Sequence, residues 1–473
     1  MRIRTLALAT AVSALAFPTA AQDAAPLGAE IESTTKVLIQ QGLRDTAGLK
    51  FVEDLTTEIG PRLAGSPQEA LARDWAVAEL NELGFANVRV EGFEIPYWSR
   101  VIDEVSITSP SMQAVAATAL GGSAETPEGG VEAELVRFTS LAALIAAPAS
   151  QVSGKIVFID EHMIKSMNGA GYGMAVRKRG GCAKVATAKG AVACLIRSAG
   201  TQSHRMPHTG GMLRDGAEGA GPAAAVSAPD ADQFARLLER GPVKVRVNIQ
   251  TEISDSAPSG NVIAEVTGSD LKDEIVLISC HLDSWDLGTG ALDDAAGCGI
   301  VVGAAKLIAD LPKPPRRTIR VVLYGSEEVG LFGGKSYAET HAEEMDAHIL
   351  AAESDFGAGN IWRFQTGFGE GALPYAKTIQ SILAPLGVTP DNNESGGGPD
   401  ISMLPGLGVP VVTPGQNGMD YFDYHHTPDD TFDKIDPETF RQNVAVYAAF
   451  TYIAAETGWD FRKELDVEPT GTE

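Results

Sequence analysis

Apolar residues recur along this chain with two different spacings. In residues 66–85 (SPQEALARDWAVAELNELGF) they recur every three or four positions, which predicts an amphipathic helix that Ser66 caps and Pro67 begins. Residues 31–59 also have a helical pattern, and residues 87–95 (NVRVEGFEI) predict a strand. The first part of the chain is therefore expected to be helical, with one strand at its end.

From residue 251 onward, short apolar runs alternate with helical stretches. Near-continuous apolar strands separated by helices are typical of an α/β fold, in which helices cover both faces of a mainly parallel central sheet. The predicted strands are residues 274–281, 317–328, 347–355 and 408–415, and the helical stretches include 298–311 and 372–386.

The segment between these two regions has a different character. Alanine, glycine and proline dominate residues 109–250, where residues 154–160 and 191–197 predict short strands and residues 233–241 predict a helix. We interpret residues 110–250 as an inserted domain with its own small sheet. The main domain would then be discontinuous and comprise residues 22–109 and 251–473.

The N-terminus has the layout of a secretory signal peptide. Arg2 and Arg4 precede an apolar segment, and small residues around Ala20 and Ala21 provide a cleavage site, so residues 1–21 are expected to be removed. A membrane anchor is the alternative, but the apolar segment is short for a membrane span. No later stretch is long and apolar enough for one. The mature protein is therefore expected to be secreted or periplasmic, without a membrane partner.

Charge and cysteine content narrow the possibilities further. The chain has 473 residues and a formal net charge of −25, which argues against nucleic acid or anionic membrane as a partner, because both need a basic face. The same acidity also serves solubility. The four cysteines of an exported chain allow three pairings. Cys182–Cys194 and Cys280–Cys298 are the pairs nearest in sequence, although buried free thiols are an alternative.

Candidate chemistry gathers where the predicted strands end. Sites in open α/β sheets lie outside the carboxyl ends of the strands, so residues that follow different strands can meet there. Taken singly, each of these residues has an ordinary structural explanation, such as a helix cap or a solvated surface pair. The residues at the strand ends and in the neighbouring loops are His281, Asp293, Asp294, Glu327, Glu328, Asp355, His425 and His426.

Histidine nitrogen and carboxylate oxygen together suit zinc, and a mixed set of five ligands suits two zinc ions that share one carboxylate. Two such ions can lower the pKa of a water and polarise a carbonyl. Hydrolysis also needs a base that does not bind metal. Because adjacent side chains at a strand end diverge, one member of the Glu327–Glu328 pair can bind metal while the other acts as the base.

Several stretches resemble the co-catalytic zinc peptidases of clan MH, a family that includes zinc aminopeptidases and glutamate carboxypeptidases. Within it the resemblance is nearest to the plasma glutamate carboxypeptidases, and it covers nearly all of the expected mature chain. The matching stretches are IGPRLAGS (59–66), IRSAGTQSHRMPHTG (196–210), HLDSWDLGTGALDDAAG (281–297), GSEEVGL (325–331), ESD (353–355) and HHTPDDT (425–431).

The resemblance implies a role for each matched residue. Asp293 would bridge two zinc ions, and a cis peptide bond is expected between Asp293 and Asp294. Glu327 would be the general base, and Asp283 would orient the imidazole of His281. The inserted domain would be a protease-associated cap over the cleft. The remaining metal ligands would be His281 and Asp355 for one ion, and Glu328 and His426 for the other.

Substrate and assembly follow less directly from the sequence. The resemblance implies a small peptide substrate and a homodimer, with Asp400, Tyr424 and His425 as candidate substrate contacts. A dipeptidase and an aminopeptidase of broader range both stay open, as does a non-catalytic peptide-binding protein on the same fold. Zinc is the expected metal, with manganese and cobalt as alternatives. His204 and His208 are interpreted as structural residues or as part of the cleft entrance rather than as a further metal site.

Overall fold

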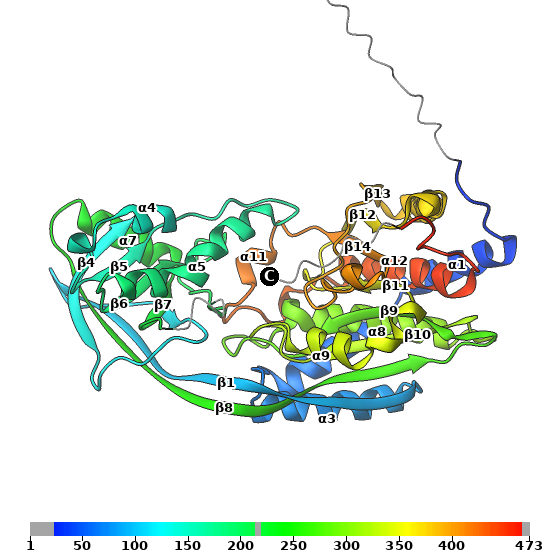
Figure 1. The fold of residues 1–473 in the computed structure, drawn as a ribbon, viewed down its shortest axis with the longest axis horizontal. Coiled ribbons are helices and arrows are strands. Elements are labelled where there is room, and N and C mark those ends of the chain that lie inside the picture. Colours follow the sequence, from blue (N-terminus) through cyan, green and yellow to red (C-terminus); the bar gives the residue numbers. More distant parts are fainter. Residues whose placement is uncertain (1–22, 213–218, 466–473) are drawn as a thin grey trace, which may run out of the picture.

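The computed structural model describes residues 23–212 and 219–465. The predicted signal peptide, residues 1–21, lies outside the described residues. Two lobes of unequal size lie side by side in Figure 1, and two long strands run beneath them from one lobe to the other. Among the helices of the described ranges, none combines the length and the apolar character that a membrane span requires.

The larger lobe contains the predicted α/β sheet. Its central strands are parallel, because β9 pairs in parallel with both β10 and β11, and β11 pairs in parallel with β14. The antiparallel strands β12 and β8 flank this parallel centre. The bounds are β8 (Lys244–Val266), β9 (Leu271–His281), β10 (Arg317–Tyr324), β11 (His348–Glu353), β12 (Ile361–Gly367), β13 (Thr389–Pro390) and β14 (Val411–Gln416).

Helices cover both faces of this sheet, as the apolar pattern predicts. Side chains alternate along β9, so Val276 and Ile278 face one apolar core and Leu277 faces the other. The first core includes α1 (Ala29–Gly42), α2 (Ala47–Asp54), α3 (Pro67–Glu82), α8 (Ala296–Ala309), α10 (Leu373–Leu383) and α12 (Pro437–Glu456), and the second includes α9 (Phe332–Thr340). At the start of α3, the Ser66 side chain accepts a hydrogen bond from the backbone N–H of Glu69, as a helix cap should.

The smaller lobe has a four-stranded parallel layer of its own, with β3 antiparallel at its far edge. This layer is not an isolated sheet, because β4 also pairs with β8 and so joins it to the sheet of the larger lobe. The elements are β3 (Ala117–Ala119), β4 (Val131–Phe138), α4 (Leu141–Ala146), β5 (Ile156–Ile159), α5 (Ala170–Ala188), β6 (Ala193–Arg197), β7 (Ala223–Val226) and α7 (Ala228–Leu238).

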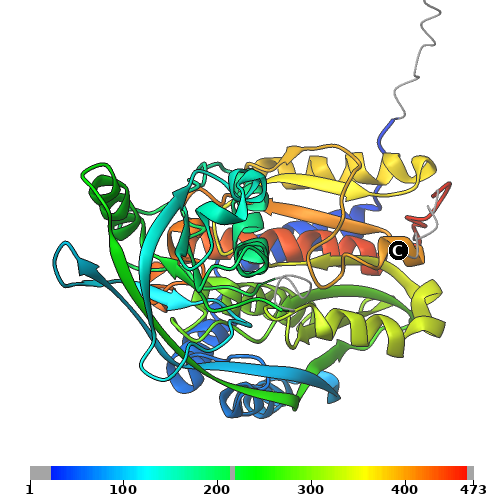
Figure 2. The ribbon, with the colours of Figure 1, turned by 60° about the vertical axis from the view of Figure 1, so that its left-hand side comes forward.

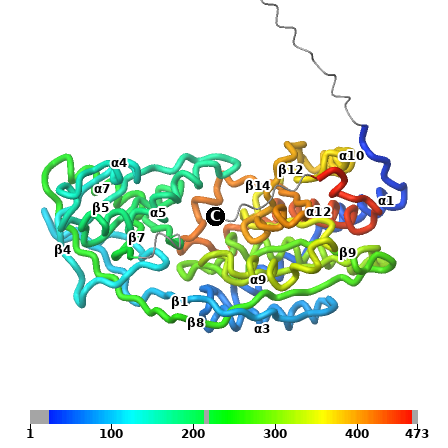
Figure 3. The backbone as a smooth tube through the Cα atoms, in the orientation of Figure 1, coloured from blue at the N-terminus to red at the C-terminus, as the bar shows by residue number. Residues whose placement is uncertain are grey.

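The two long strands form a ribbon that neither lobe contains completely. The strand expected at residues 87–95 is in fact β1 (Ala86–Ser109), which pairs antiparallel with β8 and also with the short strand β2 (Gln113–Val115). The pairing register shifts between Ile95 and Tyr97 and again between Arg100 and Ile102. Figures 2 and 3 show the ribbon curving from one lobe to the other. The predicted boundary at residue 110 follows the end of β1, whereas residue 250 falls inside β8.

Both sequence-local cysteine pairs are disulfides in the structure, and no described cysteine is free. Cys182–Cys194 joins α5 to β6 inside the smaller lobe. Cys280–Cys298 joins the end of β9 to α8, directly beside the residues that the sequence predicts as metal ligands.

Candidate metal centre

The carboxyl ends of three neighbouring strands supply most of the candidate ligands. His281 is the last residue of β9, Glu327 and Glu328 follow β10, and Asp355 follows β11. Because these strands are parallel neighbours, their ends lie at one edge of the sheet. Asp293 reaches the same place from the turn before α8, and its peptide bond to Asp294 is cis, as the resemblance implies.

The first group of donor atoms surrounds the imidazole of His281. Its Nε2 lies 3.1 Å from Asp293 Oδ1 and 3.6 Å from Asp355 Oδ1. A tetrahedral zinc ion with bonds of about 2.0–2.2 Å places its ligand atoms roughly 3.3 Å apart. The separations in this group are therefore those that a shared metal ion requires.

The second group uses the other oxygen of Asp293. His426 Nε2 lies 3.1 Å from Asp293 Oδ2 and 3.0 Å from Glu328 Oε2. His426 follows the short helix α11 (Tyr421–Tyr424), which lies between the two lobes in Figure 1. The two groups thus meet at Asp293, whose two oxygens face different imidazoles, which is the arrangement of a bridging carboxylate.

A second imidazole is close to this group as well. His425 Nε2 lies 3.4 Å from Asp293 Oδ2, and the rings of His425 and His426 stack with their centroids 3.5 Å apart. His426 has the additional contact with Glu328. The geometry therefore supports His426 as the ligand, with His425 stacked against it, and the assignment of both residues stays a prediction.

The electrostatics of the centre indicate that it fits cations. Burial disfavours charge on Asp293, but the imidazoles of His425, His281 and His426 outweigh this effect and hold the pKa of Asp293 well below its usual range. Burial likewise opposes the charged form of His426, but the carboxylates of Glu328 and Asp293 raise its pKa to about 9. Without other cations, the imidazoles themselves have to neutralise the carboxylates.

Two buried oxygens add to this fit. Glu328 Oε1 is buried without a hydrogen-bond partner, and Asp293 Oδ2 has no well-formed hydrogen bond although His426 Nε2 lies 3.1 Å away. A buried charged oxygen without a donor is costly, and a bound cation removes that cost. The donor types, their spacing and these two oxygens together fit a pair of divalent metal ions.

Asp283 has a broader role than the resemblance implies. The imidazole Nδ1 of His281 lies 2.9 Å from the backbone carbonyl oxygen of Asp283, whereas the nearest carboxylate oxygen is 3.6 Å away. The carboxylate instead accepts hydrogen bonds from the backbone N–H groups of Glu327, at 3.0 Å, and Glu328, at 3.3 Å. One residue therefore orients a metal ligand through its main chain and fixes the Glu327–Glu328 pair through its side chain.

Two further residues that support the centre had not been assigned from the sequence. The buried guanidinium of Arg62 donates to four backbone carbonyls, including those of Leu282 and Gly290. These two residues flank residues 283–289, which we call the acidic loop. Burial lowers the pKa of Arg62 to about 10, and the surrounding carboxylates oppose that fall. Asp430 accepts hydrogen bonds from the backbone N–H groups of Leu292 and Asp293. Both residues stand in the quoted sequence stretches, but only their contacts reveal these roles.

The metal centre opens into a cleft of about 560 Å³ between the lobes. Glu327 lines it without belonging to either donor group, and its burial raises its pKa well above the usual carboxyl range. The smaller lobe contributes Tyr172 and Arg179 to the wall of the cleft. Arg179 Nη1 lies 3.4 Å from His426 Nδ1, so a cation from the inserted segment reaches the edge of the centre.

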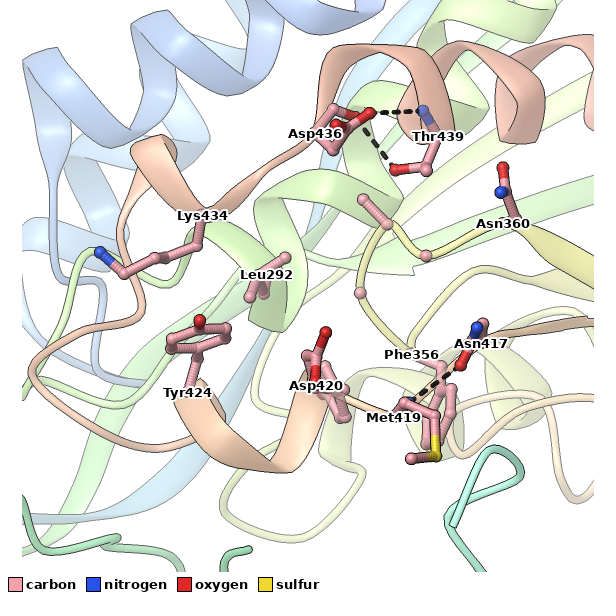
Figure 4. A pocket seen from close by; sticks show the side chains of 14 residues that line it. Leu292, Phe356, Asn360, Asn417, Met419, Asp420, Tyr424, Lys434, Asp436 and Thr439 are labelled. Carbon is pink, nitrogen blue, oxygen red and sulfur yellow. Dashed lines mark hydrogen bonds between the residues drawn. The ribbon is translucent and has the colours of Figure 1, made fainter. Parts of the chain in front are cut away.

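The other candidate substrate contacts lie away from this cleft. Tyr424 lines a neighbouring pocket of about 240 Å³, where Figure 4 shows it close to Lys434. The two cavities share Phe356 and Tyr421. Asp400 is buried, and its carboxylate accepts a hydrogen bond from the backbone N–H of Gly334. Of the three candidates, only His425 is in the wall of the cleft.

Among the described residues, no group of metal-binding donors gathers around His204 or His208 of the inserted segment. His208 is buried, and its Nδ1 lies 2.7 Å from the backbone carbonyl oxygen of His425. Burial lowers its pKa to about 3, so the ring is neutral at physiological pH. His204 donates its backbone N–H to the side chain of Gln202. His208 is thus a structural residue that supports the loop carrying His425 and His426.

A parallel α/β sheet whose strand ends gather imidazoles and carboxylates around one shared aspartate is the kind of site that metal-dependent hydrolases use. Comparison with known proteins specifies the family. The model of peptidase family M28 matches residues 261–451, and carboxypeptidase Q of Mus musculus is 34% identical over 404 residues, which cover 85% of this chain and 84% of that protein. The chain belongs to peptidase family M28, as the sequence resemblance indicates.

Solved structures support this placement. The peptidase M28 precursor from Shewanella amazonensis is 49% identical, with a TM-score of 0.90 over 92% of this chain and 98% of its own. A zinc aminopeptidase from Bacillus subtilis shares the fold at 20% identity, with a TM-score of 0.64 over 89% of this chain and 98% of its own. The predicted α/β architecture is therefore confirmed.

Proposed function

We propose that this protein is an exported dinuclear zinc exopeptidase that hydrolyses dipeptides with free ends. The observation that carries this proposal is the pair of donor groups that share Asp293, beside a glutamate that belongs to neither group. The names of the relatives, carboxypeptidase and aminopeptidase, support an exopeptidase.

In this proposal the residues of the centre have separate tasks. His281 and Asp355 would hold one zinc ion, Glu328 and His426 the other, and Asp293 would bridge them. Zinc bound there would lower the pKa of a water and polarise the scissile carbonyl. Glu327 would take the proton of the attacking water and pass it to the leaving amine, since it lines the cleft beside both donor groups without belonging to either.

The dipeptide preference rests on the charges of the cleft. A free dipeptide carries an ammonium group at one end and a carboxylate at the other. The guanidinium of Arg179 in the wall of the cleft suits the carboxylate. Because Arg179 comes from the smaller lobe, that lobe would contact the C-terminal end of a short substrate, which favours dipeptides over longer peptides.

The test compares one dipeptide in three forms: free, N-acetylated and C-amidated. A dipeptidase cleaves only the free form. In the Arg179→Met variant, the rates at which the free and the amidated dipeptide are cleaved should become more similar. Equal cleavage of the free and amidated forms would instead indicate an aminopeptidase of broader range.

Glu327→Gln tests the catalytic assignment. The variant should bind zinc normally and lose turnover, whereas unchanged turnover would exclude Glu327 as the base. A wild-type protein that binds two zinc ions and cleaves none of the three dipeptides would be a non-catalytic binding protein.

Export is supported by the two disulfides and by the sequence of the N-terminus. Sequencing the N-terminus of the mature protein tests it, and a chain that begins near Gln22 is the expected result. The homodimer stays a prediction.

A further inference from the structure

The imidazole of His426 has its second nitrogen bound by the smaller lobe. A histidine that binds a metal through Nε2 carries its proton on Nδ1, so Nδ1 needs an acceptor. The backbone carbonyl oxygen of Thr209 lies 3.2 Å from His426 Nδ1, and the Thr209 N–H donates to the carbonyl oxygen of His426 at 3.0 Å. Arg179 lies near the same nitrogen, but a guanidinium has only donors. Thr209 is therefore the partner that the ligand needs.

Thr209 is in turn held by a buried arginine of the ribbon. Arg100 Nη2 donates to Thr209 Oγ1 at 2.7 Å and to the backbone carbonyl oxygen of Ala119 at 3.2 Å. Thr209 is completely buried, and the Arg100 side chain is 9% exposed. This part of the smaller lobe is thus fixed to β1.

The same guanidinium also reaches the acidic loop of the larger lobe. Arg100 Nη1 lies 2.5 Å from Asp286 Oδ1, and the guanidinium lies over the ring of Trp285 at 5.9 Å. The Trp285 ring is in turn 5.9 Å from the ring of His426. Arg100 therefore connects the acceptor of the His426 proton to the loop that passes behind the same imidazole.

We propose that Arg100 is a positioning residue for the metal ion that His426 binds. It holds Thr209 and Asp286 at a fixed separation and thereby keeps the Thr209 carbonyl on the His426 proton. The inference rests on the proposed metal centre, and it distinguishes the two ions. The Arg100 contacts described above involve neither His281 nor Asp355, so the ion at those residues, which shares only Asp293 with the other ion, should depend on Arg100 much less.

The test measures zinc affinity, by competition with a chelator, in two backgrounds that each keep one donor group intact. In Asp355→Asn, which keeps the His426 group, adding Arg100→Gln should weaken the remaining zinc roughly 10- to 100-fold, as loss of an outer partner of a metal ligand typically does. In Glu328→Gln, which keeps the His281 group, the same change should alter the affinity less than twofold. Arg100→Lys should restore part of the loss.

Arg197→Gln is the matched control. Arg197 is similarly buried and pairs with Asp160 at 2.6 Å, but it lies within the smaller lobe. The Arg197→Gln change should leave zinc affinity unchanged in both backgrounds. Thr209→Val removes the hydroxyl contact without removing a buried charge, and a smaller loss confined to the Asp355→Asn background is expected.

Two results would overturn the inference: equal weakening of zinc in both backgrounds, or no weakening in the Asp355→Asn background. Affinity is measured rather than turnover, so a protein that binds two zinc ions without cleaving peptides would refute the proposed function while the comparison of Arg100 variants still decides this inference.

Discussion

A single substitution at Asp283 should disturb the base and a metal ligand together. The two carboxylate oxygens of Asp283 accept the backbone N–H groups of Glu327 and Glu328, and Asp283 is completely buried. In Asp283→Asn one oxygen becomes an NH2 group, so in either orientation of the amide one backbone N–H faces another donor. The variant keeps the size of the side chain, loses one of the two hydrogen bonds and leaves the other without its charged acceptor.

The size of the effect follows from that one bond. A hydrogen bond to a charged group contributes about 1.5–3 kcal/mol, and each 1.4 kcal/mol corresponds to a tenfold change in rate. If the loss appears at the position of Glu327 in the transition state, kcat should fall roughly 10- to 150-fold with little change in KM. Asp283→Ala, which removes both acceptors, should reduce kcat further.

The assay is steady-state cleavage of the free dipeptide by protein with a measured zinc content. Asp273→Asn is the control, because Asp273 is an exposed residue near the start of β9, the strand that ends two residues before Asp283, and it should leave kcat unchanged. Asp283→Asn activity within threefold of wild type at full zinc content would refute the role assigned to the Asp283 carboxylate.

Three further predictions concern stability. Arg62→Met should lower the free energy of unfolding by about 3–5 kcal/mol in urea denaturation, because it leaves buried carbonyls and carboxylates without their cation; a loss below about 1 kcal/mol would contradict this. Replacing both Cys280 and Cys298 by serine should cost about 2–5 kcal/mol, and an unchanged thermal midpoint would count against it. Burial lowers the pKa of His348 from 6.5 to about 4. Between these two pH values the His348 imidazole is therefore mostly neutral in the folded protein, whereas the same imidazole in the unfolded chain binds a proton. Stability is thus lost as pH falls from 6.5 toward 4, and His348→Gln should reduce that loss by up to about 1.4 kcal/mol per pH unit, which denaturation at several pH values checks.

Much of the larger lobe could be predicted from sequence because its strands are buried on both faces. The runs at 274–281 and 317–328 contain the continuous apolar segments IVLI (275–278) and VVLY (321–324), and the structure places β9 and β10 there. His281, Glu328 and Asp355 could be found for the same reason, since they stand where such strands end, whereas His426 lies in the loop after α11 and was assigned through the family resemblance.

The ribbon could not be predicted in the same way. β1 has exposed positions along most of its length, so charged and polar residues interrupt the alternation, and Pro96 divides the apolar pattern. The contacts that support the candidate metal centre could not be predicted from the sequence either. Arg100 and Thr209 are 109 residues apart, and nothing in the local pattern of either residue indicates the other. Such partners become visible only when the fold brings them together.

The shape of the ribbon also determines how the smaller lobe can move. Its two strands are hydrogen-bonded along most of their length, which resists sliding of one past the other, so bending of the ribbon is the simplest way for the lobe to move. The register shift beside Arg100 marks such a bend, because an irregularity in a strand pair curves it locally. A swing at this pivot would withdraw Arg179 and the Thr209 carbonyl in one movement. Release of the product and loosening of one metal ligand would then be a single mechanical event.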